Sequence, residues 1–148
     1  MAETQTTQVY RVFIRATAEQ VWDAITKAEF TTGYFFGGRI ETTLEPGSPI
    51  RYHSPSRDGL DIDGEVVESD PPHKLVHTFR SLWDDDLAAE PPSRVTWELE
   101  PADGGVCQLT VTHDQLERSP KTAGQVSGWS YILSGMKTLL ETGKPMAA

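Results

Sequence analysis

The side chains best suited to chemistry in this sequence are four histidines and one cysteine. His73 and His77 stand four residues apart, which on a helix would place two imidazoles on one face as a metal pair. Both fall in a segment that reads as a β-strand, where four residues span about 13 Å. Two ligands of one zinc ion, each about 2 Å from it, lie within about 4 Å of one another. Since no carboxylate or cysteine is evidently placed beside His53 or His113, we predict no metal site.

The remaining candidates also favour a protein without a catalytic centre. Cys107 shares one face of its predicted strand with Leu109 and Val111, so we expect a buried thiol, not a nucleophile beside a base. His113 lies on the same face of this predicted strand as Cys107, and two interpretations of its role stay open. Its neutral imidazole could orient the polar end of a ligand, or it could bond to the backbone near the strand end. The sequence has no nucleophile elbow, phosphate-binding glycine loop or dinucleotide fingerprint, so we predict no catalytic residue and no cofactor.

Composition excludes several classes of partner. The 148 residues include 13 basic and 22 acidic side chains, a formal charge of −9 that repels nucleic acids and anionic membranes. No stretch approaches the roughly 20 apolar residues of a membrane span, and the first residues do not resemble a secretory signal. One cysteine cannot form an internal disulfide, so we expect a cytoplasmic protein. The run Asp84 to Asp86 lacks the spacing of a calcium loop and is expected to be a solvated loop.

Apolar segments separated by turn residues predict an antiparallel meander. After the first strand, Thr17 with Gln20 three residues later forms a capping box that starts an amphipathic helix. A second short helix or irregular turn is expected over residues 28–34. The predicted strands are 9–15, 39–44, 50–54, 60–69, 73–82, 94–100 and 106–113.

One long amphipathic helix is expected to close the chain, from Ser119 to Gly143. Pro120 suits its first position, and Gly143 suits its end. We expect this helix to lie across the concave face of a curved sheet and to enclose a cavity, with Trp97 and Trp129 facing each other. A single domain over residues 9–143 is predicted, with flexible ends 1–8 and 144–148. The apolar stripe of the helix is Val126, Trp129, Ile132, Leu133, Met136, Leu139 and Leu140.

This order of elements resembles the helix-grip fold, an α+β class in which a curved antiparallel sheet of six to seven strands wraps around a long carboxy-terminal helix. Residues 12–26 are similar to the opening of the family related to the carboxy-terminal domain of the activator of heat-shock protein 90 ATPase. The resemblance runs in order from about Val9 to Glu141. Its further motifs are residues 64–68, 71–75, 95–99 and 109–113, and Gly128-Trp129 with Leu133, Met136-Lys137 and Leu140-Glu141.

The resemblance implies membership of the superfamily that includes lipid-transfer START domains, the birch-pollen allergen and polyketide cyclases. These proteins share a pocket between sheet and last helix, while their chemistry differs. Our first expectation is therefore non-catalytic binding of a small hydrophobic or aromatic molecule. The second is a cyclase, aromatase or dehydratase-like enzyme in which His113, Arg51, Asp61 or Glu98 transfers protons.

The third expectation is a chaperone-linked or regulatory interaction module, related to stress. We expect no separate amino-terminal module like that of the eukaryotic co-chaperone ahead of Val9, and therefore do not expect activation of a chaperone ATPase. A monomer and a homodimer are both compatible with the sequence. The side chains expected to contact the ligand are Trp22, Phe36, Arg51, His53, His77, Phe79, Trp97, His113, Trp129, Leu133 and Met136.

Overall fold

A curved antiparallel sheet dominates the computed structural model, which describes residues 7–56, 58–124 and 128–146. Within these residues the sheet has seven strands in the order β1-β7-β6-β5-β4-β3-β2. Every neighbouring pair is antiparallel, which confirms the predicted meander. The strands are β1 Gln8–Ile14, β2 Arg39–Thr42, β3 Pro49–His53, β4 Leu60–Asp70, β5 Lys74–Ser81, β6 Ser93–Ala102 and β7 Val106–Asp114.

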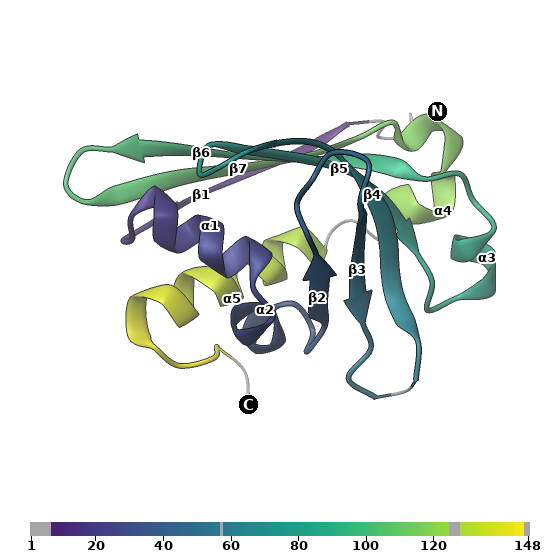
Figure 1. The fold of residues 1–148 in the computed structure, drawn as a ribbon, viewed down its shortest axis with the longest axis horizontal. Helices are drawn as coiled ribbons and strands as arrows, with labels where there is room; N and C mark the ends of the chain where they lie inside the picture. Colours follow the sequence, from purple (N-terminus) through teal and green to yellow (C-terminus); the bar gives the residue numbers. More distant parts are fainter. Residues whose placement is uncertain (1–6, 57, 125–127, 147–148) are drawn as a thin grey trace.

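Helices α1, α2 and α5 lie on one side of this sheet (Figure 1). The predicted capping box is present at the start of α1, where Thr17 and Gln20 each accept the backbone N–H of the other. None of the described helices is long and apolar enough to cross a membrane. The helical elements are α1 Ala18–Thr26, α2 Ala28–Tyr34, α3 Asp85–Ala88, a 3-10 turn at Leu116–Arg118, α4 Pro120–Ala123 and α5 Gly128–Thr142.

The acidic segment after β5 is not the plain loop that we expected. Helix α3 forms there because the Asp84 carboxylate accepts the backbone N–H groups of Asp86 and Leu87. Leu87 is buried, so this short helix is anchored by a side chain as well as by its cap.

The closing helix differs from the prediction at its beginning. Instead of one helix from Ser119 to Gly143, the structure has α4, which ends at Ala123 with Gly124 as its cap, and a separate α5. Residues 125–127, including the Val126 of the predicted stripe, lie outside the described residues. In Figure 1, α4 lies near α3 at one end of the sheet, whereas α5 runs beneath the concave face.

Contacts with the preceding loop explain the position of α4. The Glu90 carboxylate accepts the backbone N–H groups of Lys121 and Thr122, at 2.9 and 2.8 Å, and the Thr122 hydroxyl at 2.8 Å. The Ser119 hydroxyl donates to the backbone oxygen of Pro91 at 2.6 Å instead of capping the helix. The first turn is therefore tied to the segment before β6, a contact that helical periodicity cannot indicate.

Helix α5 is the long element that covers the sheet. Its residues Trp129, Ile132, Leu133 and Met136 are buried, as the predicted stripe requires. The expected flexibility of residues 1–8 and 144–148 stays a prediction, because 1–6 and 147–148 lie outside the described residues.

A glycine in β4 allows the sheet to bend. A Cβ atom at Gly64 would lie 1.9 Å from the backbone oxygen of Thr78, so only glycine permits this approach of β4 to β5. The register of the two strands shifts just beyond, between Val66 and Glu68. Figure 1 shows the consequence: β2, β3 and β4 turn downward from the layer formed by β1, β5, β6 and β7. This turn makes the concave side deep enough to hold a chamber.

Replacing Gly64 by alanine should therefore destabilise the protein. We expect Gly64→Ala to lower the free energy of unfolding by about 1–3 kcal/mol, because the added methyl group overpacks against rigid backbone. Gly124→Ala is the control, since its Cβ would lie 3.4 Å from the nearest oxygen. Urea unfolding of both variants tests this, and equal midpoints for Gly64→Ala and the native protein would contradict the close approach.

Candidate ligand-binding chamber

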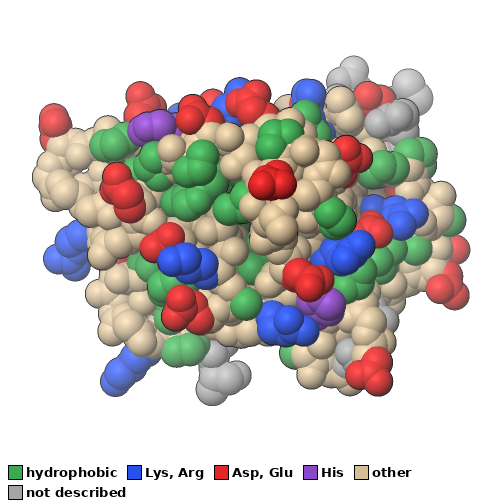
Figure 2. Space-filling view, in the orientation of Figure 1, with side chains coloured by type: hydrophobic (Ala, Val, Ile, Leu, Met, Phe, Trp, Pro, Cys, Tyr) green, Lys and Arg blue, Asp and Glu red, His purple; other side chains and the backbone are tan. Residues whose placement is uncertain are grey.

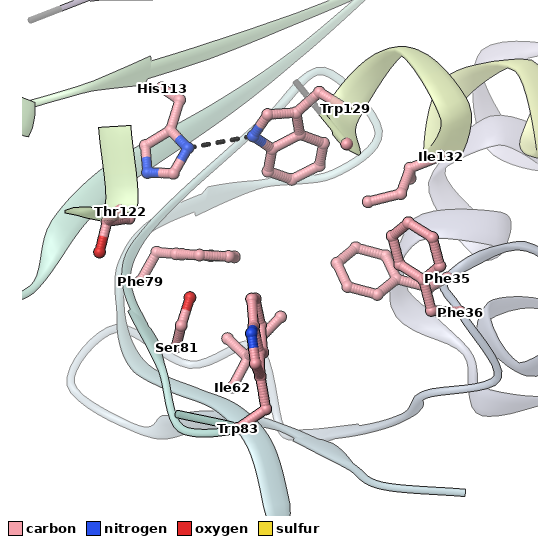
Figure 3. Close-up of a pocket in the computed structure, with 11 residues that line it drawn as sticks. Phe35, Phe36, Ile62, Phe79, Ser81, Trp83, His113, Thr122, Trp129 and Ile132 are labelled. Carbon is pink, nitrogen blue, oxygen red and sulfur yellow. Dashed lines mark hydrogen bonds between the residues drawn. The ribbon is translucent and has the colours of Figure 1, made fainter. Parts of the chain in front are cut away.

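An apolar chamber lies between the sheet and the beginning of α5 (Figure 3). Its volume is about 70 Å³. Figure 3 shows aromatic rings around this space, with Trp129 and Ile132 of α5 on one side and Phe79 of β5 on the other. The lining residues are Phe35, Phe36, Ile62, Phe79, Ser81, Trp83, His113, Thr122, Gly128, Trp129 and Ile132.

A larger chamber of about 390 Å³ adjoins the first toward the surface. Both are lined by Phe35, Phe36, Ile62, Trp83 and Gly128, so they form an inner and an outer part of one site. The side chains of Phe36 and Trp83 are 59% and 48% exposed, which places the mouth of the site beside them. The outer chamber adds Gly38, Tyr52 and Asp61.

Strand alternation determines which side chains reach the inner chamber. In β5 the buried positions include Leu75, His77, Phe79 and Ser81, every second residue. Because successive side chains of a strand point to opposite faces, these four point to the concave side. In β7 the same rule turns His113 inward with its neighbour Val111, as predicted.

A chain of hydrogen bonds holds His113 at the chamber wall. The Trp129 indole N–H donates to Nδ1 of His113 at 3.0 Å, drawn as the dashed line in Figure 3. Since an indole nitrogen can only donate, Nδ1 is the unprotonated nitrogen and Nε2 carries the hydrogen. Nε2 then donates to the Ser93 hydroxyl at 2.6 Å, and that hydroxyl donates to the backbone oxygen of Phe79 at 3.2 Å.

His77 is held in a similar way but in the opposite tautomer. The Trp97 indole N–H donates to Nε2 of His77 at 3.0 Å. Nδ1 of His77 therefore carries the hydrogen, and it donates to the backbone oxygen of Thr78 at 2.8 Å. Each buried histidine thus pairs with one buried tryptophan.

The two pairs meet where sheet and helix touch. The rings of Trp97 and Trp129 are edge to face with their centroids 5.2 Å apart, which confirms the predicted contact. Burial lowers the pKa of His77 and of His113 to about 4. Both imidazoles are therefore neutral at physiological pH. Both nitrogens of His113 are also engaged, so this residue has neither a free lone pair nor a free proton for acid–base catalysis.

The structure places several residues of the predicted site away from the chambers. Arg51 and His53 lie on the outer face of β3, beside Glu41, because Ile50 and Tyr52 take the inward positions. Figure 2 shows a histidine with acidic and basic side chains gathered over β2 and β3.

Other predicted contacts are buried but do not line the site. Trp22, Leu133 and Met136 belong to the hydrophobic core, and His77 and Trp97 form the wall behind Trp129. The residues that the prediction and the inner chamber share are Phe36, Phe79, His113 and Trp129.

Of the carboxylates considered for proton transfer, Asp61 lines the outer chamber. Glu98 lies in a groove elsewhere with Arg11 and Lys74. Among the described residues, no group of three or more histidine, cysteine or acidic side chains is placed to hold a metal ion.

Sequence reasoning missed two serines that the site depends on. Ser81 continues the inward series of β5, and Ser93 precedes Val95 and Trp97 on the inward series of β6. The alternation of inward and outward side chains along β5 and β6 could have identified both serines. The Ser81 side chain is 1% exposed, and its hydroxyl oxygen has no hydrogen-bond partner among the described residues.

A curved antiparallel sheet that is closed by a carboxy-terminal helix over an apolar chamber defines a helix-grip protein. The family model described as Activator of Hsp90 ATPase homolog 1-like protein matches residues 15–141. The chain therefore belongs to this family, as its sequence motifs indicated. No curated protein matches the chain by sequence.

Solved structures of similar fold come from varied organisms. An HSP90 activator from Plasmodium falciparum is 22% identical, with 95% of this chain and 99% of that chain covered and a TM-score of 0.74. The Aha1 dimer from Colwellia psychrerythraea is 19% identical, with coverages of 95% and 99% and a TM-score of 0.72. Protein MLL2253 from Mesorhizobium loti is 21% identical, with coverages of 91% and 96% and a TM-score of 0.74. At these identities the likeness establishes the fold.

The two inward serines should respond oppositely to loss of the hydroxyl. Ser81→Ala should raise the free energy of unfolding by about 1 kcal/mol, because it removes a buried polar group without a partner. Ser93→Ala should lower it by about 1–3 kcal/mol, because it leaves the Nε2–H of His113 unpaired. Chemical unfolding of both variants measures the difference, and a loss of stability in Ser81→Ala would show that its hydroxyl is already satisfied.

The buried histidines should make folding sensitive to acid. Because their folded pKa values of about 4 lie below the ordinary 6.5, the unfolded chain binds more protons between these two pH values. The free energy of unfolding should be at its full value above pH 6.5. It should fall by up to about 3 kcal/mol per histidine as the pH drops through this window. Urea unfolding as a function of pH measures the loss.

Nitrogen-15 spectra of the imidazole rings provide the structural control. We expect the hydrogen on Nε2 in His113 and on Nδ1 in His77, with both rings still neutral at pH 5.5. Protonation of either ring at pH 6 would contradict the hydrogen-bond pattern.

Proposed function

We propose that this protein binds a small, largely hydrophobic or aromatic molecule in the joined chambers without transforming it. The observation that carries the proposal is an apolar hollow that remains between sheet and α5 and opens to the surface beside Phe36 and Trp83. Ligand sites in proteins are concave and mostly apolar, with few polar groups. The lining of the inner chamber has this character.

Aromatic side chains supply most of the contact surface. The rings of Phe79 and Trp129 lie 6.1 Å apart, and those of Phe35 and Trp129 stand edge to face at the same centroid separation. Such rings contact a flat apolar molecule over a large area at low entropic cost, because each has only two side-chain torsions. An aromatic or short aliphatic body suits this site better than a polar metabolite.

The arrangement of His113 favours binding over catalysis. Of the described residues in the inner lining, it is the one with an ionisable side chain, and both of its nitrogens are occupied. A cyclase-like activity would therefore depend on Asp61, in the outer chamber. That enzyme remains our alternative, and product formation that is lost in Asp61→Asn would favour it.

The interaction module is the second alternative, supported by the fold that the chain shares with the Plasmodium HSP90 activator. Cytoplasmic location and a role in stress stay expectations from the sequence. Both a monomer and a homodimer are compatible with the site, and the Colwellia protein is described as a dimer.

Ligand binding can be tested by narrowing the passage between the chambers. Gly128 lines both, and a Cβ there would lie 3.7 Å from the Phe36 ring, so Gly128→Leu should fill the passage without a backbone clash. The matched control is Gly124→Leu, because Gly124 lines neither chamber. A panel of neutral aromatic compounds and lipids is screened by thermal unfolding, where a ligand at 100 times its Kd adds about 2.7 kcal/mol.

We expect compounds that stabilise the native protein and Gly124→Leu to bind at least tenfold more weakly to Gly128→Leu. Native mass spectrometry of the purified protein should reveal any ligand that co-purifies. If no compound shifts the transition and no added mass appears, the proposed function is wrong.

A further inference from the structure

Among the described residues, Ser81 offers a free hydrogen-bonding group in the inner chamber. Its side chain is almost fully buried, its hydroxyl is unpaired among the described residues, and Figure 3 shows the oxygen pointing into the space beside Phe79. The other hydroxyl of the lining, on Thr122, already donates to Glu90. A buried hydroxyl without a partner costs stability, so a ligand group that pairs with Ser81 recovers a hydrogen bond that the protein alone lacks.

The sizes of the two chambers suggest how a ligand would lie. Cavities that hold benzene are about 150 Å³. The inner chamber, at about 70 Å³, is too small for a whole ring, whereas the outer chamber of about 390 Å³ is large enough. A ligand that uses both would place a small group inside and its ring system outside, between Phe36 and Trp83.

The charges around the chambers restrict the nature of that small group. The described residues of the inner lining include no lysine, arginine, aspartate or glutamate, and their one histidine is neutral. Among the described residues of the outer lining, Asp61 is the one acidic residue and no residue is basic. A carboxylate or phosphate would lose its hydration there without gaining a cation, and the chain as a whole carries a formal charge of −9.

We propose that the site selects an uncharged aromatic molecule that enters with a hydroxyl or carbonyl group first and pairs that group with the Ser81 hydroxyl. The serine can donate to a carbonyl and can either donate to or accept from a hydroxyl, so both groups fit. This inference rests on the proposed function, because it assigns the ligand class of the same chamber. It makes Ser81 a specificity-determining residue.

Three probes of matched shape test the selection: naphthalene, 2-naphthol and 2-naphthoate. The native protein should bind 2-naphthol about 3–10-fold more tightly than naphthalene, the range expected for one neutral hydrogen bond. It should bind 2-naphthoate at least tenfold more weakly than 2-naphthol at pH 7.5. In Ser81→Ala the preference for 2-naphthol over naphthalene should disappear, while naphthalene binds as before.

Ser130→Ala is the matched control, since Ser130 is an exposed serine on α5 and should leave all three affinities unchanged. Equal binding of naphthalene and 2-naphthol by the native protein, or a preference that persists in Ser81→Ala, would overturn the inference and leave the proposed function intact. The inference would also be overturned if the native protein bound 2-naphthoate most tightly of the three probes. If none of the three probes binds while another compound of the panel does, the inference fails and the proposed function stands. If no compound of the panel binds and no ligand co-purifies, both fail.

Discussion

The contact between Trp97 and Trp129 is the constraint on which the rest of this structure depends. It joins the middle of the sheet to the start of α5, and a neutral buried histidine accepts the N–H of each indole. Each buried indole N–H needs an acceptor, because leaving it unpaired would lower the free energy of unfolding. The two histidines supply these acceptors. The orientation of both rings, and with it the position of α5 over the sheet, is fixed by hydrogen bonds as well as by packing.

The chamber exists because the contact between Trp97 and Trp129 and the bend of the sheet keep the walls of the chamber apart. Gly64 lets β4 turn toward α5, while Trp129 keeps the beginning of α5 at the distance of an edge-to-face aromatic contact. Small side chains then occupy positions that a larger one could have filled, Ser81 on β5 and Gly128 on α5. The hollow is a consequence of rigid aromatic supports around small residues, in contrast to the close packing usual in protein interiors.

The polar side chains around the site fall into two groups, those that hydrogen-bond within the described part of the protein and one that does not. His77, His113 and Ser93 bond to tryptophan N–H groups, to the backbone or to one another and serve the structure, whereas the Ser81 hydroxyl has no partner among the described residues. This division explains why histidines that attract notice in the sequence are poor catalytic candidates here. It also explains why an inconspicuous serine carries the specificity that we infer.

From the sequence alone, motifs indicated the family, turn residues predicted the antiparallel meander, and periodicity placed His113 on one strand face with Leu109 and Val111 and Trp129 on the apolar stripe of the last helix. These features are recorded within single segments of the chain. The same alternation would have turned Arg51 and His53 outward and Ser81 inward, had it been applied to every strand. Only the tertiary structure decided which histidine pairs with which tryptophan, and only it separated α4 from α5 through Glu90. It also decided where a hollow remains. These features depend on the volumes and hydrogen-bonding groups of residues far apart in the chain, and no pattern within one segment records how such residues meet.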